Sequence, residues 1–553
     1  MSDTEDKAPV VEKSVPPPKY GDNPSSAVDA QARIVQQKGI LDDVIDGVQL
    51  GLLVILFICL IFAAVLGRSL PTVFPVTQPI YDFVLSLPET VSNLPQTLYA
   101  AWEIRPTNAE ELTEAFRMLS EWFQVTLHTL PYKQCVLGFS WSMYLLETKL
   151  NIRQRDRLHE VRRPKAISSF ISRQVYLEAN AYGLDKSSLQ LVKDFVGQIQ
   201  TTVIIVYDMI PQLWTEVGVQ MEVWLGLGSD YAITQSVLFF IAVMAISTVL
   251  SLPFDLYATF VVEKRHGFNK QTMGLFFSDM FKSLVLMVVL GTPILAGFLW
   301  VIDRTGSKFF LYAWALMALV QLLLIVIYPT VIQPLFNKFD PLPQGELREA
   351  IEALASRLNF PLKKLYMVDG SKRSSHSNAY VFGFFKAKRI VIYDTLIEQC
   401  TTDEIVAVVG HELGHWKQNH TLRMLAVAQF QILFIFFAFS CFIAEQSMYT
   451  SFGIDGMPVM LGFLFFQYLY EPLGSLMQFA VNVMSRKHEF EADEFSKNLG
   501  YGKSLASCLI KLQIENKATM NPDPIYSAYT YSHPPLVERL NALGNPHLAS
   551  KKE

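Results

Sequence analysis

Cysteine and positive charge are both scarce in this sequence, and each scarcity excludes a class of site or partner. Only 5 of the 553 residues are cysteine, and none of them stands in a CxxC pair, so neither a disulfide framework nor a thiolate metal site is indicated. Lysine and arginine number 46 against 51 acidic residues, and they form no stripe interleaved with aromatics. Because phosphate neutralisation requires clustered basic side chains, nucleic acid is excluded as a partner.

The layout of a secretory signal peptide is also lacking. The first forty residues are acidic and rich in proline, with SDTED followed by VPPPK. With few large apolar side chains, such a stretch cannot bury enough surface to offset the entropy lost on ordering. We therefore expect residues 1–46 to form a disordered tail and the first apolar run, 47–67, to be a retained membrane anchor.

Apolar side chains, by contrast, are abundant. They make up 51% of the chain, and the mean hydropathy is +0.26, which indicates a polytopic membrane protein. A helix needs about 20 apolar residues to span a bilayer, and eight runs approach that length. The predicted crossings are 47–67, 133–150, 200–227, 233–254, 284–302, 309–330, 424–444 and 459–483.

The basic residues of the short loops predict the orientation of these crossings. The loop after the second crossing, NIRQRDRLHEVRRPK, is heavily basic, so the positive-inside rule places it in the cytosol. Counting crossings from there places 255–283, 331–423 and 484–553 on the same side. The loops that fall on the other side carry few basic residues, so the count is self-consistent.

A soluble pattern interrupts the apolar runs after residue 330. It contains an amphipathic helix near 344–358, two strands with the sequences KKLYMVDG and RIVIYDT, and a helix that begins at Thr402. The expected division of the chain is a disordered tail at 1–46, a transmembrane helix at 47–67, a linker with an amphipathic helix at 68–132, further membrane helices at 133–330, a cytosolic domain at 331–423, two transmembrane helices at 424–483 and a second cytosolic part at 484–553.

The stretch GHELGHWKQNH contains a pattern that can bind a metal ion. His411 and His415 stand at i and i+4, so on a helix both imidazoles point from one face. Glu412 points about 100° around the helix, which suits a base that takes a proton from zinc-bound water, whose pKa is lowered to about 7. A buried histidine pair without metal is the alternative, and a third ligand decides between them.

The segment SRKHEFEAD, at 485–493, supplies candidates for that ligand. Glu489 and Asp493 share a helix face, so one carboxylate could bind the metal while the other orients a histidine or hands a proton to the leaving amine. A solvated charged helix is the alternative. His488 is a competing ligand but faces about 100° away from Glu489. His420 lies off the ligand face, and we expect it to be a surface residue.

Five motifs together resemble the type I CaaX prenyl endopeptidases, which are integral-membrane zinc proteases that trim prenylated proteins. They are GHELGHW, SRKHEFEAD, GSKRSSHSNAYVFGFFKAKRIVIYDTL, FVVEKRHGFNKQT and YSHPPLVERLNAL. The resemblance runs from about Phe139 to Leu543. Residues 1 to about 130 have no recognised counterpart, so the expected fold has one crossing more than the family's seven.

The resemblance implies a mainly α-helical fold, in which seven transmembrane helices enclose a large chamber, here with one extra N-terminal transmembrane helix. A cytosolic, gluzincin-like α+β zinc protease domain with the HExxH pattern caps the chamber. The family pattern implies that His411, His415 and Glu489 bind one Zn²⁺ per chain. It implies that Glu412 is the general base.

Further roles are implied at matching positions. Asp493 is similar to a residue that supports a zinc ligand or donates a proton. His533 and Arg539 resemble a pair that contacts the substrate backbone and stabilises the oxyanion, for which donors beside the metal are needed. Asn378 and Ala379 lie on what resembles an edge strand that pairs with an extended peptide. The alternatives are a turn residue held by the following prolines for His533 and a turn-capping amide for Asn378.

The function expected from this resemblance is removal of the last three residues after a prenylated cysteine, with a second upstream cleavage in some substrates. The partners are then prenylated CaaX proteins and membrane lipid, and the expected location is the endoplasmic reticulum with the contiguous nuclear envelope. One alternative is a membrane quality-control protease with broader substrates. Another is a non-catalytic membrane scaffold with structural zinc, against which the intact Glu412 argues.

Overall fold

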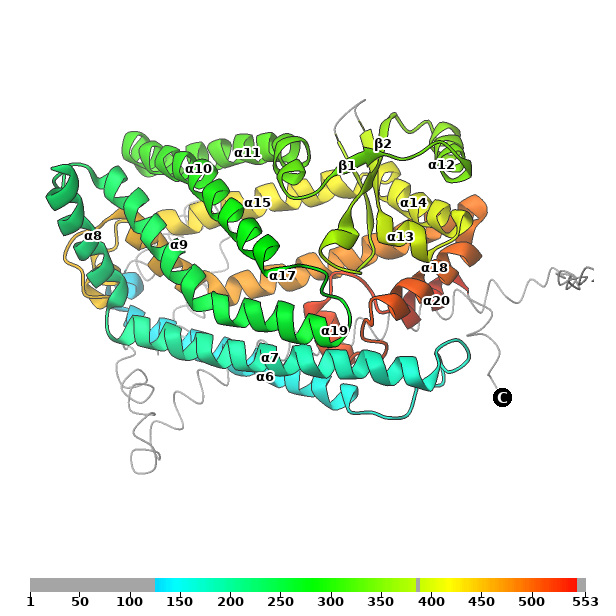
Figure 1. The fold of residues 1–553 in the computed structure, drawn as a ribbon. Helices are drawn as coiled ribbons and strands as arrows, with labels where there is room; N and C mark the ends of the chain where they lie inside the picture. Colours follow the sequence, from blue (N-terminus) through cyan, green and yellow to red (C-terminus); the bar gives the residue numbers. More distant parts are fainter. Residues whose placement is uncertain (1–124, 384–387, 545–553) are drawn as a thin grey trace, which may run out of the picture. The chain divides into compact units, whose positions relative to one another are not determined.

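The computed structural model describes residues 125–383 and 388–544 (Figure 1). The predicted tail at 1–46, the predicted crossing at 47–67 and the amphipathic segment at 110–123 lie outside the described residues, as does most of the linker that contains that segment. The described part is mainly helical, with long apolar helices and one small mixed sheet.

Eight helices contain the apolar runs of the described part. Three segments are long and apolar enough to cross a membrane by length and composition, namely Ala232–Glu263, Met273–Leu335 and His420–Ser440. The second of these holds two helices, which turn back on each other at a left-handed glycine, Gly306. The helices are α6 (Tyr132–Leu158), α7 (Arg173–Val206), α8 (Met209–Leu225), α9 (Ala232–Tyr257), α10 (Met273–Thr305), α11 (Phe309–Ile327), α15 (His420–Ser440) and α17 (Val459–Ser496).

The predicted crossing at 200–227 is wrong as a single helix. Helix α7 ends at Val206, and α8 begins at Met209 after Asp208 adopts a left-handed conformation with φ 51°. Aspartate tolerates this conformation better than most residues, and Lys133 Nζ holds its carboxylate at 2.8 Å. A hydropathy window detects only apolar content. It therefore misses the helix break at Asp208, which is followed by Pro211 in the first turn of α8.

Helix α17 is long enough to leave the membrane and enter the soluble part. At 38 residues it spans about 57 Å, whereas the hydrocarbon core of a bilayer is about 30 Å thick. Its first part covers the predicted crossing at 459–483, which is not among the three segments named above and stays a prediction. Its second half carries Glu489 and Asp493 beside α14 (Thr402–Lys417), against which it packs (Figure 1).

A four-stranded sheet with the order β1-β2-β4-β3 forms the β part of the soluble region. Strands β2 and β4 are parallel, and the two outer strands pair antiparallel to them. The predicted strands are confirmed as β2 and β4, and the predicted helix near 344–358 is confirmed as α12 (Glu346–Arg357). The strands are β1 (Phe339–Pro341), β2 (Leu362–Val368), β3 (Ala379–Phe382) and β4 (Lys388–Tyr393).

The sheet and α14 share one apolar core. Ile390 and Ile392 of β4 are buried against Val409 and Leu413, which lie on the face of α14 turned away from solvent. Each such side chain contributes roughly 1.5–3 kcal/mol when it is fully buried. The core therefore fixes both the position and the rotation of the helix that carries the two predicted metal-binding histidines.

Segments predicted to lie on one side of the membrane contact one another. Arg153 belongs to the predicted basic loop, but the structure places it in the last turns of α6, where it pairs with Asp523 at 2.9 Å. Lys517 donates to the backbone oxygen of His266 at 3.1 Å. These contacts agree with a shared side for the loops after α6 and α9 and the C-terminal part, while the compartment itself stays a prediction.

Candidate metal centre and active site

Helix α14 presents its two histidines to one point. Thr401 and Glu404 form a capping box that begins the helix, so the first-turn amides are satisfied before the apolar face starts. One turn separates His411 from His415, and their Nε2 atoms lie 3.1 Å apart. The predicted shared face is therefore confirmed.

Two glycines let α17 approach this face closely. A Cβ on Gly414 would lie 3.2 Å from the backbone Cα of Ala492 and 3.1 Å from Phe495 Cβ. A Cβ on Gly410 would lie 3.2 Å from Ser496 Oγ, whose hydroxyl donates to a backbone carbonyl of α14. Side chains at these positions would push the helices apart, so the glycines of GHELGH allow α17 to deliver its carboxylates.

The carboxylate of Glu489 completes a three-ligand set with the histidines. Its oxygens lie 3.5 Å from His411 Nε2 and 3.3 Å from His415 Nε2. Ligands at about 2.0–2.1 Å from a tetrahedral zinc ion are about 3.3 Å from one another. The three separations are close to this value, although each histidine faces a different oxygen of Glu489. Among the described residues, Glu489 Oε2 is also a buried atom without a hydrogen-bond partner. The residues present therefore fit a metal ion.

Asp493 supports His411 from the side opposite the ligand atom. Its Oδ1 lies 2.8 Å from His411 Nδ1, and Arg539 clamps both carboxylate oxygens, with Nε 2.8 Å and Nη2 2.6 Å away. Burial would raise the pKa of Asp493, but the bonds from Arg539 and His411 lower it. Since Asp493 is only 1% exposed and stays ionised, the geometry favours an orienting role over proton donation.

Two carboxylates with lowered pKa values lie beside His411. Burial alone would lower the pKa of His411, but the neighbouring carboxylates of Asp493 and Glu489 raise it to about 9. Glu489 likewise has a lowered pKa, because its bonds to the two histidines outweigh the effect of burial. The carboxylates thus hold negative charge around the histidines.

Glu412 has the electrostatics of a general base held among charged neighbours. The side chain follows the first ligand on α14 and is half-buried. Burial raises its pKa, and the negative charge of Glu489 raises it further, whereas the two histidines and Arg539 act in the opposite direction. A carboxylate with a raised pKa is better suited to accept and return a proton near neutral pH.

The loop between α19 (Pro524–Thr530) and α20 (Leu536–Leu543) brings His533 to the metal-binding residues. His533 Nε2 lies 3.4 Å from Glu489 Oε1, and its ring is 66% exposed. Arg486, which sequence reasoning assigned no role, donates from Nη1 to the carbonyls of Ala528 and Tyr531, each at 2.7 Å. A buried arginine one turn before Glu489 thus holds the loop that carries His533.

Asn378 and Ala379 lie at the free edge of the sheet, as expected. Strand β3 begins at Ala379, and within the described residues β4 is its one partner strand. The backbone oxygen of Asn378 accepts from Tyr393, so the ladder bonds flank Ala379 and its peptide groups face the open edge. Asn378 Oδ1 accepts the Ala379 N–H at 2.8 Å.

The prediction that His420 is a surface residue is wrong. The residue is 3% exposed, and its Nδ1 lies 2.9 Å from His415 Nδ1. Helix α14 ends at Lys417, and Asn419 adopts φ 58° before α15 starts, so a helical wheel drawn from His415 does not apply at residue 420. His488, the competing ligand, stacks on His420 and is absent from the three-ligand set.

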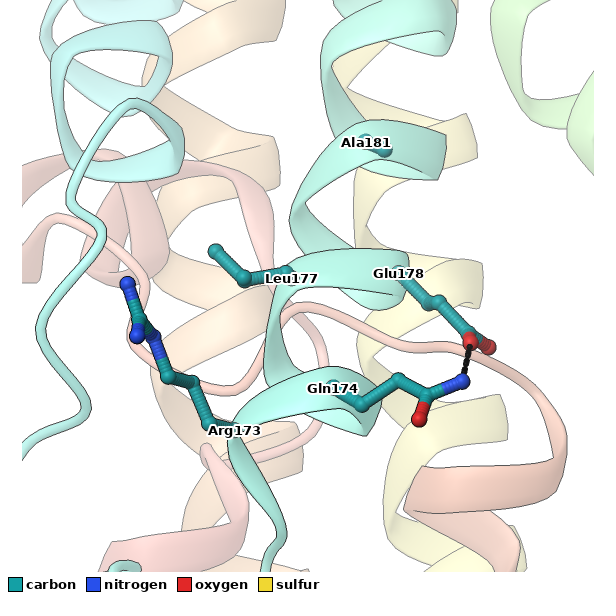
Figure 2. A pocket seen from close by; sticks show the side chains of 5 residues that line it. All are labelled: Arg173, Gln174, Leu177, Glu178 and Ala181. Carbon is teal, nitrogen blue, oxygen red and sulfur yellow. Dashed lines mark hydrogen bonds between the residues drawn. The ribbon is translucent and has the colours of Figure 1, made fainter.

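A surface depression on α7 carries none of the predicted site residues. Figure 2 shows it lined by Arg173, Gln174, Leu177, Glu178 and Ala181, which all come from two turns of one helix. Gln174 donates to Glu178 at 3.0 Å. The depression is open and shallow, so it offers no enclosed place for chemistry.

Two family models match consecutive parts of the chain. Residues 154–338 match the pattern described as CAAX prenyl protease N-terminal, five membrane helices. Residues 341–547 match peptidase family M48. The second match contains every residue of the site described above.

Curated relatives and a solved structure agree with both matches. The CAAX prenyl protease 1 homolog of Arabidopsis thaliana is 47% identical over 415 residues, which are 75% of this chain and 98% of the relative. The human homolog is 39% identical over 449 residues, 74% of this chain and 94% of that protein. The crystal structure of S. mikatae Ste24p superposes with a TM-score of 0.72 at 40% identity and covers 75% of this chain and 99% of its own. The chain therefore belongs to peptidase family M48, in the group of the CAAX prenyl proteases 1, and is an integral-membrane metalloprotease.

Proposed function

We propose that this protein is a zinc endopeptidase that removes the C-terminal tripeptide from prenylated CaaX proteins and cuts some of them a second time upstream. The observation that carries the proposal is the convergence of His411, His415 and Glu489 beside Glu412. The substrate class follows from the relatives, which are named CAAX prenyl proteases.

The donor set supports zinc as the metal. Two imidazoles and one carboxylate form a common zinc ligand set in hydrolases, and His411, His415 and Glu489 would hold the ion. Zinc, when bound, supplies a Lewis acid that polarises a carbonyl and lowers the pKa of water from 15.7 to about 7. Glu412 then takes up the proton that is released during hydrolysis and returns it to the leaving amine.

Neighbouring residues hold the reacting groups in place. Asp493 fixes the ring of His411 through its Nδ1, and Arg539 locks Asp493. The exposed ring of His533 faces the ligand set and is placed to donate to the oxygen that gains charge during attack. Arg539 is 12% exposed and contributes positive charge at the same place.

The free edge of β3 is the proposed binding site for the substrate backbone. The outward peptide groups of Ala379 can pair with an extended chain, which requires no particular side chains. Asn378, next to it, would hydrogen-bond the same peptide. The prenyl chain would lie among the membrane helices, with the site facing the cytosol from the endoplasmic reticulum or nuclear envelope.

Cleavage of a farnesylated CaaX peptide and of its unprenylated twin by the purified protein tests the proposal. We expect the farnesylated peptide to release its tripeptide much faster, and Glu412→Ala to release none. Equal rates on both peptides would favour the quality-control protease. Equal rates for the wild type and Glu412→Ala would favour the scaffold with structural zinc.

A further inference from the structure

A second carboxylate–histidine pair stands behind the other histidine ligand. His420 begins α15, and its two ring nitrogens face different partners. Its Nδ1 lies 2.9 Å from His415 Nδ1, and its Nε2 lies 2.9 Å from Glu491 Oε2. His420 therefore bridges a helix α17 carboxylate to the histidine at the metal-binding face.

The hydrogen-bond partners determine which ring nitrogens of His420 and His415 carry a proton. An ionised carboxylate only accepts hydrogen bonds, so His420 Nε2 carries a proton and donates it to Glu491. When its ring is neutral, His420 accepts at Nδ1, which makes His415 Nδ1 the donor. His415 Nε2 is left with a bare lone pair, and it is this atom that faces Glu489 at 3.3 Å.

We propose that Glu491 and His420 form a relay that orients His415 and fixes the tautomer that binds the metal. The inference rests on the proposed metal site and adds positioning residues to it. Ligating histidines generally donate their second ring nitrogen to a carboxylate, a carbonyl or water. His411 meets this need directly at Asp493, whereas His415 reaches its carboxylate through a second histidine.

The geometry of His488 argues against a second metal ion at this place. His420, His488 and Glu491 offer ligand atoms within 4.8 Å of one another. However, the two rings stack with centroids 4.1 Å apart and planes only 9° from parallel. Since nitrogen lone pairs lie in the plane of the ring, two stacked rings cannot aim at one ion. His488 instead holds the ring plane of His420.

The backbone keeps both members of the relay in place. Asn419 adopts φ 58°, which turns the chain so that His420 points back toward α14. Gln418 Nε2 donates to the backbone oxygen of Glu491 at 2.9 Å, so the end of α14 is tied to the stretch of α17 that carries the carboxylate. These backbone features hold both residues in place.

The test compares metal retention in four full-length variants with the wild type. His420→Phe keeps the stack on His488 but removes both nitrogens, and Glu491→Ala removes the carboxylate. We expect both to lose zinc to a competing chelator about 10–100-fold more readily. His420→Asn places an amide oxygen near the Nδ1 position and should recover most of the affinity. His488→Phe, the matched control, should stay within about twofold of the wild type.

A spectrum separates orientation from general loosening of the fold. In protein loaded with Co²⁺, His420→Phe should shift the visible bands, because the donor strength of His415 changes, while His488→Phe should leave them unchanged. If His420→Phe fails to fold, metal retention by Glu491→Ala and His420→Asn still tests whether Glu491 and His420 orient His415. Retention of zinc by Glu491→Ala equal to that of the wild type would overturn the relay.

Two further outcomes distinguish this proposal from the proposed function. Two zinc ions per wild-type chain, one of them lost in His488→Phe, would replace the relay with a second metal site. Zinc-dependent cleavage by the wild type, combined with normal zinc retention in His420→Phe, would end the relay and leave the protease intact. A wild type that holds no zinc and cleaves no peptide would end both.

Discussion

His411 Nδ1 lies 2.8 Å from Asp493 Oδ1. This contact joins α14, which precedes the hairpin of α15 and α17 in the chain, to α17, the second helix of that hairpin. The close packing of α14 on α17 depends on Gly410 and Gly414. The metal-binding residues therefore meet only when the hairpin of α15 and α17 has folded. Binding of a metal ion should in turn stabilise that packing, since it binds the folded state alone.

Replacing Asp493 by asparagine should weaken both metal binding and folding. The variant leaves the guanidinium of Arg539 without its ionic partner, and breaking a buried pair costs about 3 kcal/mol or more. His411 loses the carboxylate that orients it, so zinc affinity should fall about 10–100-fold. Chelator competition and thermal unfolding in detergent measure the two effects.

The double variant Asp493→Asn with Arg539→Met serves as the control for this prediction. It removes both charges, so it should regain much of the stability lost in Asp493→Asn while zinc affinity stays low. Zinc affinity equal to that of the wild type in either variant would contradict an orienting role for Asp493.

Glu412→Gln should slow turnover strongly without releasing the metal. The side chain points about 100° around the helix from the ligands, so zinc content should match the wild type. Loss of the base should lower kcat by about 10²–10⁴-fold. Single-turnover release of the tripeptide and metal analysis on the same preparation check both halves. Loss of zinc together with activity would instead make Glu412 part of the ligand set.

The shared helix faces of the site residues were predicted from helical spacing, and the structure shows them. His411 and His415 lie in one unbroken helix, and Glu489 and Asp493 lie in another, so a rotation of 100° per residue holds across each pair. The apolar period also located α12, β2 and β4. These features depend only on neighbours within one element, which a sequence records directly.

Features that depend on a helix break or on distant backbone could not be predicted this way. The turn at Asn419, with φ 58°, redirects His420 toward His415, and the turn at Asp208 divides a continuous apolar run. Arg486 binds carbonyl oxygens that lie 41–45 residues further along the chain. Carbonyls are present at every residue, so no side-chain pattern marks them as its partners.

Arg486→Met should lower activity through the position of His533. Arg486 is 7% exposed, and its Nη1 donates to the carbonyls of Ser527, Ala528 and Tyr531. Each buried carbonyl left without a donor costs about 1–3 kcal/mol. A small displacement of His533 can reduce the rate by about 10²-fold, while the metal ligands stay in place.

Steady-state kinetics and zinc content together test the role of Arg486. We expect kcat to fall with zinc content unchanged, and Arg486→Lys, which keeps one donor group, to recover part of the loss. A variant that unfolds more readily but turns over at the wild-type rate would show that Arg486 stabilises the fold without positioning His533.

Glu404 should make the stability of the protease domain depend on pH. Burial would raise its pKa, but hydrogen bonds from Lys511, Ser507 and the Thr401 amide lower it. A carboxyl group whose pKa is lowered by folding stabilises the protein above its unfolded pKa of about 4.3, and this contribution is lost as pH falls through the lower folded value.

Thermal unfolding of Glu404→Gln at two pH values measures this contribution. The variant should be less stable than the wild type at pH 7 by about 2 kcal/mol, because it loses charge-assisted hydrogen bonds. The difference should shrink as the pH falls below about 4.3. Glu398→Gln, at an exposed position of the preceding helix, should match the wild type throughout. An equal deficit at pH 7 and at low pH would assign the effect to packing.

Ala379→Pro should raise KM by removing one donor from the free edge of the sheet. The Ala379 N–H faces away from β4 and donates to Asn378 Oδ1 at 2.8 Å. Proline at this position therefore leaves the hydrogen bonds between β3 and β4 intact. Loss of one hydrogen bond to the substrate, worth about 1.5 kcal/mol, corresponds to a KM about tenfold higher. Zinc content and unfolding temperature should stay near the wild type.

Tyr380→Pro, by contrast, removes a donor that faces Val391 and should destabilise the sheet itself. An unchanged KM in Ala379→Pro would show that the substrate backbone does not use that N–H.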